Sequence, residues 1–178
     1  MTTIIRSRFL KLAFVLLLSI LASGAQAAIH DFVNGRMVGK TVEPMRLDYF
    51  GAKPASLGNK VVLIDFWAVW CEPCRHSIPE LNKLHAELGE RGLVVLGMTR
   101  DDEKSIAEFV TRFPMQFHVG TDIDGAFFKR LAVRAMPYAV LADRSGKIIW
   151  QGDPGELTRE RIEAALGGQA KTVIPAGR

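Results

Sequence analysis

Cys71 and Cys74 are the only cysteines of this 178-residue chain, and Glu72 and Pro73 separate them. Sulfur atoms at this spacing can close and open a disulfide, and the thiolate is the form of cysteine that attacks another disulfide. An apolar, β-branched run at 61–67 precedes the pair and indicates a buried strand, whereas the sequence after it has helical periodicity. The spacing and the position together predict a redox pair at the junction of a strand and a helix.

We expect this helix to run from Cys71 to about Leu88. Cys71 would then lie near the helix N-terminus, where unpaired N–H groups and the helix dipole favour a thiolate. Cys74, one turn further in, is expected to be more shielded and to resolve the mixed disulfide that Cys71 forms. Pro73 suits an early helical position because its missing N–H would have no partner there.

Two other uses of the cysteines compete with redox chemistry. As a structural staple, a disulfide around a four-residue loop stabilises by only about 2 kcal/mol in the chain-entropy description. A zinc site needs about four ligands, and the chain offers four scattered histidines but no second cysteine pair. Redox exchange is therefore favoured and no resident metal is predicted. A protein that holds the soft ion Cu(I) between the two thiols is the alternative of another class.

The first 27 residues have the pattern of a secretory signal peptide. Three basic residues precede an apolar run of eleven residues at 12–22, and Ala25-Gln26-Ala27 matches a small-x-small cleavage signature. The run is shorter than the roughly 20 residues that span a membrane. We expect cleavage after Ala27 and a periplasmic protein, with an uncleaved membrane anchor facing the periplasm as the alternative.

Removal of that segment changes the charge of the protein. The formal net charge of the whole chain is +4, and the first 27 residues hold three basic residues and no acidic one. The remainder carries a formal charge of +1 without a run of lysine or arginine. A mixed, solvated surface is expected, and nucleic acid is not expected as a partner.

Residues 28–168 are expected to form one domain. The predicted strands are 61–67, 93–98, 117–119, 138–142 and 147–151, and the predicted helices after the first end near 113, 131 and 166. The stretch 28–60 is interrupted by glycines and prolines and is expected to form a hairpin or loose strands. Residues 169–178 have little to bury and are expected to be a disordered tail.

Several motifs in this order resemble the thioredoxin superfamily. The segment Asp65-Phe66-Trp67-Ala68-Val69-Trp70-Cys71-Glu72-Pro73-Cys74 is followed by Met136-Pro137 before a strand and by Gly152 after a hairpin. The resemblance implies an α/β, thioredoxin-like three-layer fold: a central mixed sheet, flanking helices, an N-terminal strand extension and an inserted βα element. The signal segment, these additions and the Glu-Pro dipeptide are similar to the exported TlpA/ResA/CcmG-like branch.

The resemblance assigns roles to individual residues. Cys71 would be the attacking thiol, Cys74 the resolving thiol, and Pro137 a cis-proline beside the disulfide. A cis-proline there leaves the preceding backbone free to pair with an extended substrate, so Met136 would touch the substrate. Asp65 would be the buried acid that exchanges protons with Cys74, because burial raises the pKa of a carboxyl group. A hydrogen-bonded structural acid is the alternative for Asp65.

Residues close to the cysteines are expected to shape the site. Trp70 would form a wall of it, while Trp67 could equally belong to the core. Glu72 and Pro73 would tune the pair, since the charge of Glu72 opposes a thiolate at Cys71 and so favours a less oxidising disulfide. A cation at Arg75 would favour the thiolate, with a solvated helix face as the alternative.

Three features depart from the branch. ResA-like members carry a glutamate where this chain has Ser77. The proton-handling role of that glutamate's carboxylate therefore does not carry over to this chain from the resemblance. CcmG-like members have an acidic Gly-Ala-Pro-Glu pattern at the cis-proline, whereas this chain has Arg134-Ala135-Met136-Pro137-Tyr138 there, which weakens a dedicated role in cytochrome maturation. Tyr138 replaces a commoner threonine and is expected to narrow the substrate groove.

We therefore expect an exported thiol:disulfide oxidoreductase that reduces protein disulfides and needs no cofactor beyond the Cys71–Cys74 disulfide. By resemblance, its electrons would come from a membrane reductase of the DsbD/CcdA type. Its substrates would be apocytochrome c, as in cytochrome c biogenesis, copper-site proteins or other exported thiols. An oxidant or isomerase with the same residues and the opposite electron flow is the alternative.

Overall fold

The computed structural model describes residues 35–42 and 47–167. The predicted signal peptide with its cleavage position, the alternative membrane anchor and the predicted tail at 169–178 lie outside these ranges. Within the ranges, no helix has both the length and the apolar character needed to cross a membrane. The strands and helices below all belong to one compact unit that begins at Met37.

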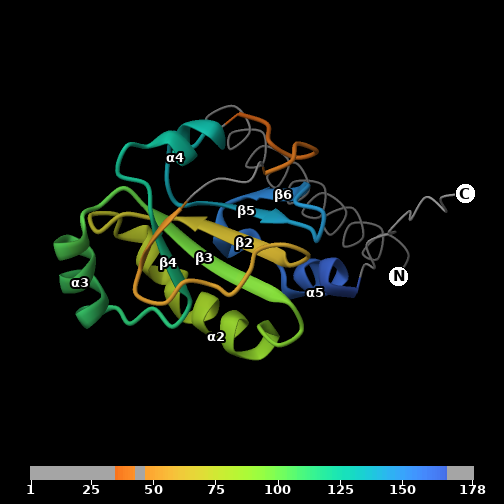
Figure 1. The fold of residues 1–178 in the computed structure, drawn as a ribbon, viewed down its shortest axis with the longest axis horizontal. Helices are drawn as coiled ribbons and strands as arrows, with labels where there is room; N and C mark the ends of the chain where they lie inside the picture. The colour runs from red at the N-terminus through yellow and green to blue at the C-terminus, as the bar shows by residue number, and fades with distance from the viewer. Residues whose placement is uncertain (1–34, 43–46, 168–178) are drawn as a thin grey trace, which may run out of the picture. The chain divides into compact units, whose positions relative to one another are not determined.

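A mixed sheet lies at the centre of this unit (Figure 1). Its strands in the described residues are β1 (Asp48–Phe50), β2 (Val61–Phe66), β3 (Leu93–Thr99), β4 (His118–Thr121), β5 (Tyr138–Ala142) and β6 (Ile148–Gly152). Their order across the sheet is β1-β4-β3-β2-β5-β6. The pairs β2–β3 and β3–β4 are parallel, whereas β1–β4, β2–β5 and β5–β6 are antiparallel. The strands β2, β3 and β5 are buried throughout, which explains their continuous apolar sequences.

Helices cover both faces of the sheet. They are α2 (Ile78–Leu88), α3 (Glu103–Arg112), α4 (Ala126–Arg130) and α5 (Arg159–Gly167), with 3-10 turns η1 (Pro73–His76) and η2 (Pro154–Glu156). Apolar side chains of α2, α3 and α5 share one core cluster with the cysteines, and those of α4 belong to a second cluster. In Figure 1, α2 and α5 accordingly lie below the sheet and α4 lies above it. This is the three-layer α/β arrangement that the sequence predicts.

The helix after β2 does not begin at the cysteines, contrary to the prediction. Cys74 lies in η1, and α2 starts only at Ile78. Pro79 has no N–H to donate to the carbonyl four residues earlier, so the α-helical ladder cannot run unbroken through this stretch. The long helix therefore presents its N-terminus seven positions after Cys71, and only a short 3-10 turn follows the first cysteine directly.

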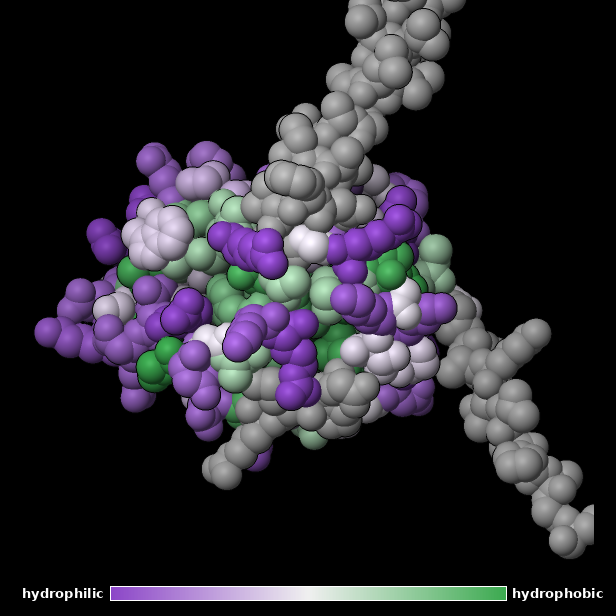
Figure 2. All heavy atoms as spheres, turned by 90° about the horizontal axis from the view of Figure 1, so that it is seen from above, coloured by the Kyte–Doolittle hydropathy of each residue, from purple (hydrophilic) through white to green (hydrophobic). Residues whose placement is uncertain are grey.

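The N-terminal stretch forms loose strands rather than a hairpin in its described part. β1 pairs with β4 at the sheet edge, and Thr41 makes an isolated bridge with Lys147. Further along the chain, α3, β4 and α4 lie between β3 and Pro137, the stretch in which the resemblance implies an inserted βα element. Figure 2, which views the molecule from above in the sense of Figure 1, shows hydrophilic and hydrophobic side chains intermixed on that face.

Candidate active site

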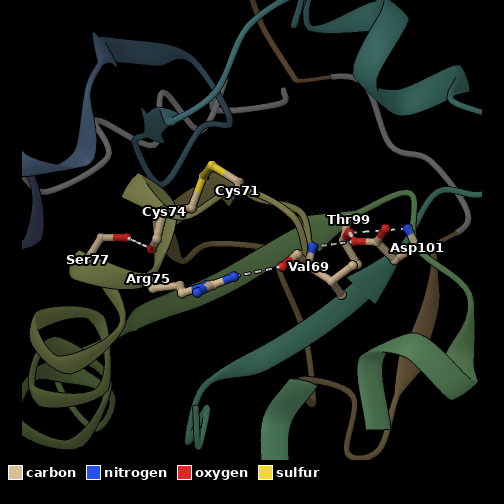
Figure 3. The surroundings of a disulfide bond; sticks show 7 residues. All are labelled: Val69, Cys71, Cys74, Arg75, Ser77, Thr99 and Asp101. Atoms are coloured by element: carbon tan, nitrogen blue, oxygen red, sulfur yellow. Dashed lines mark hydrogen bonds between the residues drawn. A yellow bond between two sulfur atoms is a disulfide. The ribbon is translucent and has the colours of Figure 1, made fainter. Parts of the chain in front are cut away.

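Cys71 and Cys74 are joined in a disulfide (Figure 3). The sulfur atoms are 1.98 Å apart and the Cα atoms 5.4 Å apart. β2 ends at Phe66, and the loop after it carries the chain to Cys71, while Cys74 lies within η1. The predicted placement of the pair after the first buried strand is confirmed.

The two cysteines do not differ in burial. Cys71 is 2 % exposed and Cys74 is 3 % exposed, so the expectation that Cys74 is the more shielded is wrong for the oxidised protein. Both belong to the same apolar cluster, because the disulfide holds them against the same neighbours. What separates them is position along the chain: Cys71 precedes η1 and Cys74 lies inside it.

The loop before Cys71 is held at both the N–H and the carbonyl of one residue, Val69. The Val69 N–H donates to Oδ2 of Asp101 at 2.8 Å, and Nη2 of Arg75 donates to the Val69 carbonyl at 3.3 Å. The Arg75 guanidinium also lies over the Phe113 ring, 5.0 Å from its centroid. Figure 3 shows that the Arg75 side chain runs toward Val69. Arg75 therefore helps to fix the loop before Cys71.

Asp65 lies in β2, on the sheet face covered by the cysteine-containing core cluster. It is 2 % exposed, and its Oδ1 has no hydrogen-bond partner among the described residues. Burial, and secondly the negative charge of Asp153, raise the pKa of Asp65 to about 7. A carboxyl group with this pKa exchanges protons near neutral pH. The unpartnered oxygen favours proton exchange over the hydrogen-bonded structural role.

A cavity of about 400 Å³, which we call the acidic cavity, lies beside the Cys74 end of the disulfide. Its walls include Pro73, His76, Glu80, Pro137 and Asp153. The sheet register explains how it relates to Asp65, because Asp65 pairs with Ala139 and Ala139 pairs with Gly152. The two small residues leave room across the sheet between Asp65 and Asp153, the residue after Gly152.

The Met136–Pro137 peptide bond is cis, as the resemblance implies. Pro137 lines the acidic cavity, whereas Met136 lines a second cavity of about 400 Å³. We call the second one the basic cavity. Its walls also include Trp67, Trp70, Arg100, Asp101, Phe128 and Arg134. The cis-proline segment thus contributes one residue to each cavity.

A family model described as Redoxin matches residues 52–166, a range that holds the disulfide, Asp65 and the cis-proline. The chain belongs to the Redoxin family. It is 32% identical over 109 residues to the thiol-disulfide oxidoreductase ResA of Bacillus thuringiensis subsp. konkukian (strain 97-27), a match that covers 61% of this chain and 62% of the relative. With ResA of Halalkalibacterium halodurans it shares 25% identity over 146 residues, which cover 82% of this chain and 76% of that one.

A solved structure agrees with these relatives. The crystal structure of a protein described as a thiol:disulfide interchange protein DsbE, from Chlorobium tepidum, has a TM-score of 0.66 and 31% sequence identity. The match covers 73% of this Redoxin chain and 98% of the other. The thioredoxin-like fold with a central mixed sheet is thereby confirmed.

This Redoxin chain uses two acidic residues that the sequence did not single out for the site. Asp101 and Asp102 both precede α3, and Asp102 is the one that caps the helix, because it accepts from the Ser105 N–H at 3.0 Å. Asp101 Oδ2 instead accepts from Val69 and, at 2.7 Å, from the Thr99 hydroxyl. Asp153 raises the pKa of Asp65 from across the sheet. Its place directly after Gly152 and the hairpin was the available signal.

Tyr138 differs from the sequence-based expectation, and Ser77 forms a local hydrogen bond. Tyr138 is fully buried and its ring lies 5.9 Å from that of Phe66, in the core cluster of the opposite sheet face. It does not narrow the groove, because it pairs with Phe66 in the register and both side chains point away from the face of Asp65. The Ser77 hydroxyl donates to the Cys74 carbonyl at 2.8 Å.

Among the described residues, no three His, Cys, Asp or Glu side chains are placed to hold a metal together.

Proposed function

We propose that this chain is an exported thiol:disulfide oxidoreductase that reduces the disulfides of other proteins. The observation that carries the proposal is the Cys71–Cys74 disulfide, which is accompanied in the same domain by a cis Met136–Pro137 bond and a buried acid, Asp65. The similarity to ResA and to the DsbE structure supports it. The match to ResA of Bacillus thuringiensis covers 62% of that protein's length. The activity of the whole relative is therefore proposed, and not stated, for this chain.

In the reduced protein, the Cys71 thiolate attacks one sulfur of a substrate disulfide. The substrate S–S bond breaks, a Cys71–substrate bond forms, and the released substrate thiolate takes a proton. Cys74 gives its proton to the Asp65 carboxylate, and its thiolate attacks Sγ of Cys71. The second substrate thiol leaves, and two electrons have passed to the substrate. The protein is left with the Cys71–Cys74 disulfide of this structure.

The surroundings of the disulfide suit a protein substrate. An extended chain can add beside Met136 as an extra strand, which places its sulfur next to Cys71. Trp70 is 70 % exposed and would cover the substrate chain near its cysteine. Glu72 and Pro73 form the exposed stretch between the cysteines. The Glu72 carboxylate opposes a thiolate at Cys71 and so favours reduction of the substrate.

A reductant in an oxidising compartment needs a source of electrons. We propose a membrane reductase of the DsbD/CcdA type as the partner that reduces the Cys71–Cys74 disulfide after each cycle. The pattern of residues 1–27, with cleavage after Ala27, supports a periplasmic location. Apocytochrome c and other exported thiols are the proposed substrates, and no cofactor enters the reaction.

Stoichiometric reduction of insulin disulfides tests this function. Pre-reduced protein, freed of small reductants, is mixed with insulin, and the thiols that appear on insulin are counted. We expect two thiols for each molecule of wild-type protein and of an exposed-site control, Asp48→Asn. Cys71→Ser should give none. A pre-reduced wild-type protein that produces no thiols on insulin would contradict the proposal. If its oxidised form, with the Cys71–Cys74 disulfide, instead oxidises added dithiols, the oxidant alternative is supported.

A further inference from the structure

The basic cavity lies beside the Cys71 end of the disulfide. The proposed reaction gives no role to its charged residues. Its floor is apolar, with Trp67 and Phe128 buried and Met136 partly buried. Arg100 and Arg134 are exposed at its walls. The one carboxylate there, Asp101, has its Oδ2 bonded to Val69 and Thr99. The cavity therefore combines an apolar floor with two guanidinium groups against one carboxylate.

We propose that the basic cavity binds an acidic side chain of the protein substrate, an aspartate or glutamate near the cysteine that Cys71 attacks. This inference rests on the proposed function, because the cavity is taken as part of the substrate groove. Guanidinium groups present several N–H donors in a plane that matches a carboxylate. The apolar floor would contact the methylene groups of the same side chain. The occupant is thus an acidic peptide segment rather than a purely apolar one.

The position of the cavity connects it to the reacting sulfur. Trp70, one residue before Cys71, forms a wall of it and is 70 % exposed. Met136, beside which a substrate strand would add, forms another wall. A substrate that pairs there with its cysteine at Cys71 would bring a nearby side chain over the cavity. The acidic cavity, with Glu80 and Asp153 at its walls, would repel the same side chain.

The Arg100 guanidinium packs against Gly125. A Cβ atom built on Gly125 would lie 3.0 Å from both Cζ and Nε of Arg100, so the guanidinium packs directly on the Gly125 backbone. Gly125 has a φ of 72°, a conformation that L side chains rarely adopt. The glycine thus gives Arg100 a flat surface to lie on. A donor held in this way loses less side-chain entropy when it binds a carboxylate.

A peptide series tests the inference. Each peptide has one cysteine, blocked as a disulfide with neutral 2-mercaptoethanol, and a variable residue placed before or after it that is glutamate, alanine or lysine. The second-order rate of peptide release by pre-reduced protein is followed by acid quench and chromatography. We expect the glutamate peptide of one series to react roughly fivefold faster than its lysine counterpart at low salt, as for a few exposed ion pairs. The ratio should approach one at high salt.

Paired arginine variants complete the test. The double variant Arg100→Gln/Arg134→Gln should remove the preference for glutamate. Arg130→Gln, the same change at an exposed residue of α4 outside the cavity, should keep it. Equal rates for all wild-type peptides would overturn the inference and leave the proposed function intact. No reaction with any peptide would overturn both. If the double variant does not fold, a wild-type preference that is absent or unaffected by salt still contradicts the inference.

Discussion

The two cavities beside the disulfide have equal volumes of about 400 Å³ but different charged walls. His76, Glu80 and Asp153 line the acidic cavity at the Cys74 end, and Arg100, Asp101 and Arg134 line the basic cavity at the Cys71 end. Pro137 and Met136, which are adjacent in the chain, serve one cavity each. The proposals for Asp65 and for the basic cavity assign different work to the two sides of the disulfide, proton exchange to one and substrate recognition to the other.

The largest effect on activity is expected at Cys71 and Cys74, which form the two ends of the disulfide. Cys74→Ser should lower the turnover rate by roughly a thousandfold or more, because the resolving thiol is gone. Substrates should accumulate as mixed disulfides on Cys71. Non-reducing electrophoresis of trapped adducts measures this, with Cys71→Ser as the matched variant. Adducts on Cys71→Ser and none on Cys74→Ser would reverse the assignment of the two ends.

The next effect concerns Asp65 and appears in stability. In the unfolded chain its carboxyl group ionises near pH 3.8, but in the folded protein only near pH 7. Between these values the folded state holds the extra proton, so the free energy of unfolding falls as pH rises, by about 4 kcal/mol in all. Asp65→Asn should lack this loss and be more stable than the wild type above pH 7.

Urea unfolding of the oxidised protein from pH 4 to 8 checks this prediction. The control is Asp48→Asn, which removes an exposed carboxylate on β1 and should follow the wild type. The same variants can be assayed for exchange, where Asp65→Asn should be slower because Cys74 loses its proton acceptor. A pH dependence of stability in Asp65→Asn equal to that of the wild type would show that the buried carboxyl group is not the cause.

A smaller effect is expected at Asp101, which fixes a wall of the basic cavity. Asp101→Ala leaves the Val69 N–H without its acceptor and should lower the free energy of unfolding by roughly 1–2 kcal/mol. Asp101→Asn keeps a side-chain oxygen and should recover most of that loss. Chemical denaturation measures both variants. Equal losses in the two would mean that the charge of Asp101, rather than its hydrogen bond, supports the loop.

The smallest effect is expected at Asp153. Asp153→Asn removes a negative charge near Asp65, so the pKa of Asp65 should fall, yet stay above 3.8 because burial is the larger cause. Asparagine retains an oxygen that can accept from the Gly155 N–H, so η2 should persist. The midpoint of the pH profile of exchange reports the shift. Glu80→Gln in the same cavity is the control, and a larger shift there would contradict the role of Asp153.

Much of the fold could be predicted because single segments carried the signal. The buried strands at 61–67, 93–98 and 138–142 are continuous apolar runs, and the CxxC pair stands between a strand and a helical period. The break before α2 was also present in the sequence as Pro79, but the periodicity of the apolar residues concealed it. Helix content was thus easier to predict than the point where the helix begins.

The parts that could not be predicted depend on contacts between distant segments. The bond from Val69 to Asp101 joins residues 32 positions apart, and the direction of Tyr138 depends on its register with Phe66. Asp153 influences Asp65 across two intervening small residues on β5 and β6. Equal burial of the cysteines follows from the closed disulfide. Sequence periodicity contains no information on any of these distances.

The midpoint potential of the Cys71–Cys74 couple tests the central claim, that this protein is a reductant, most directly. Equilibration with glutathione buffers gives the value, with Glu72→His as the informative variant and Glu90→His as its exposed control after α2. We predict a wild-type potential closer to about −270 mV, typical of thioredoxin, than to about −120 mV, typical of the oxidant DsbA. Glu72→His should be more oxidising. A wild-type value near −120 mV would contradict the assignment as a reductant.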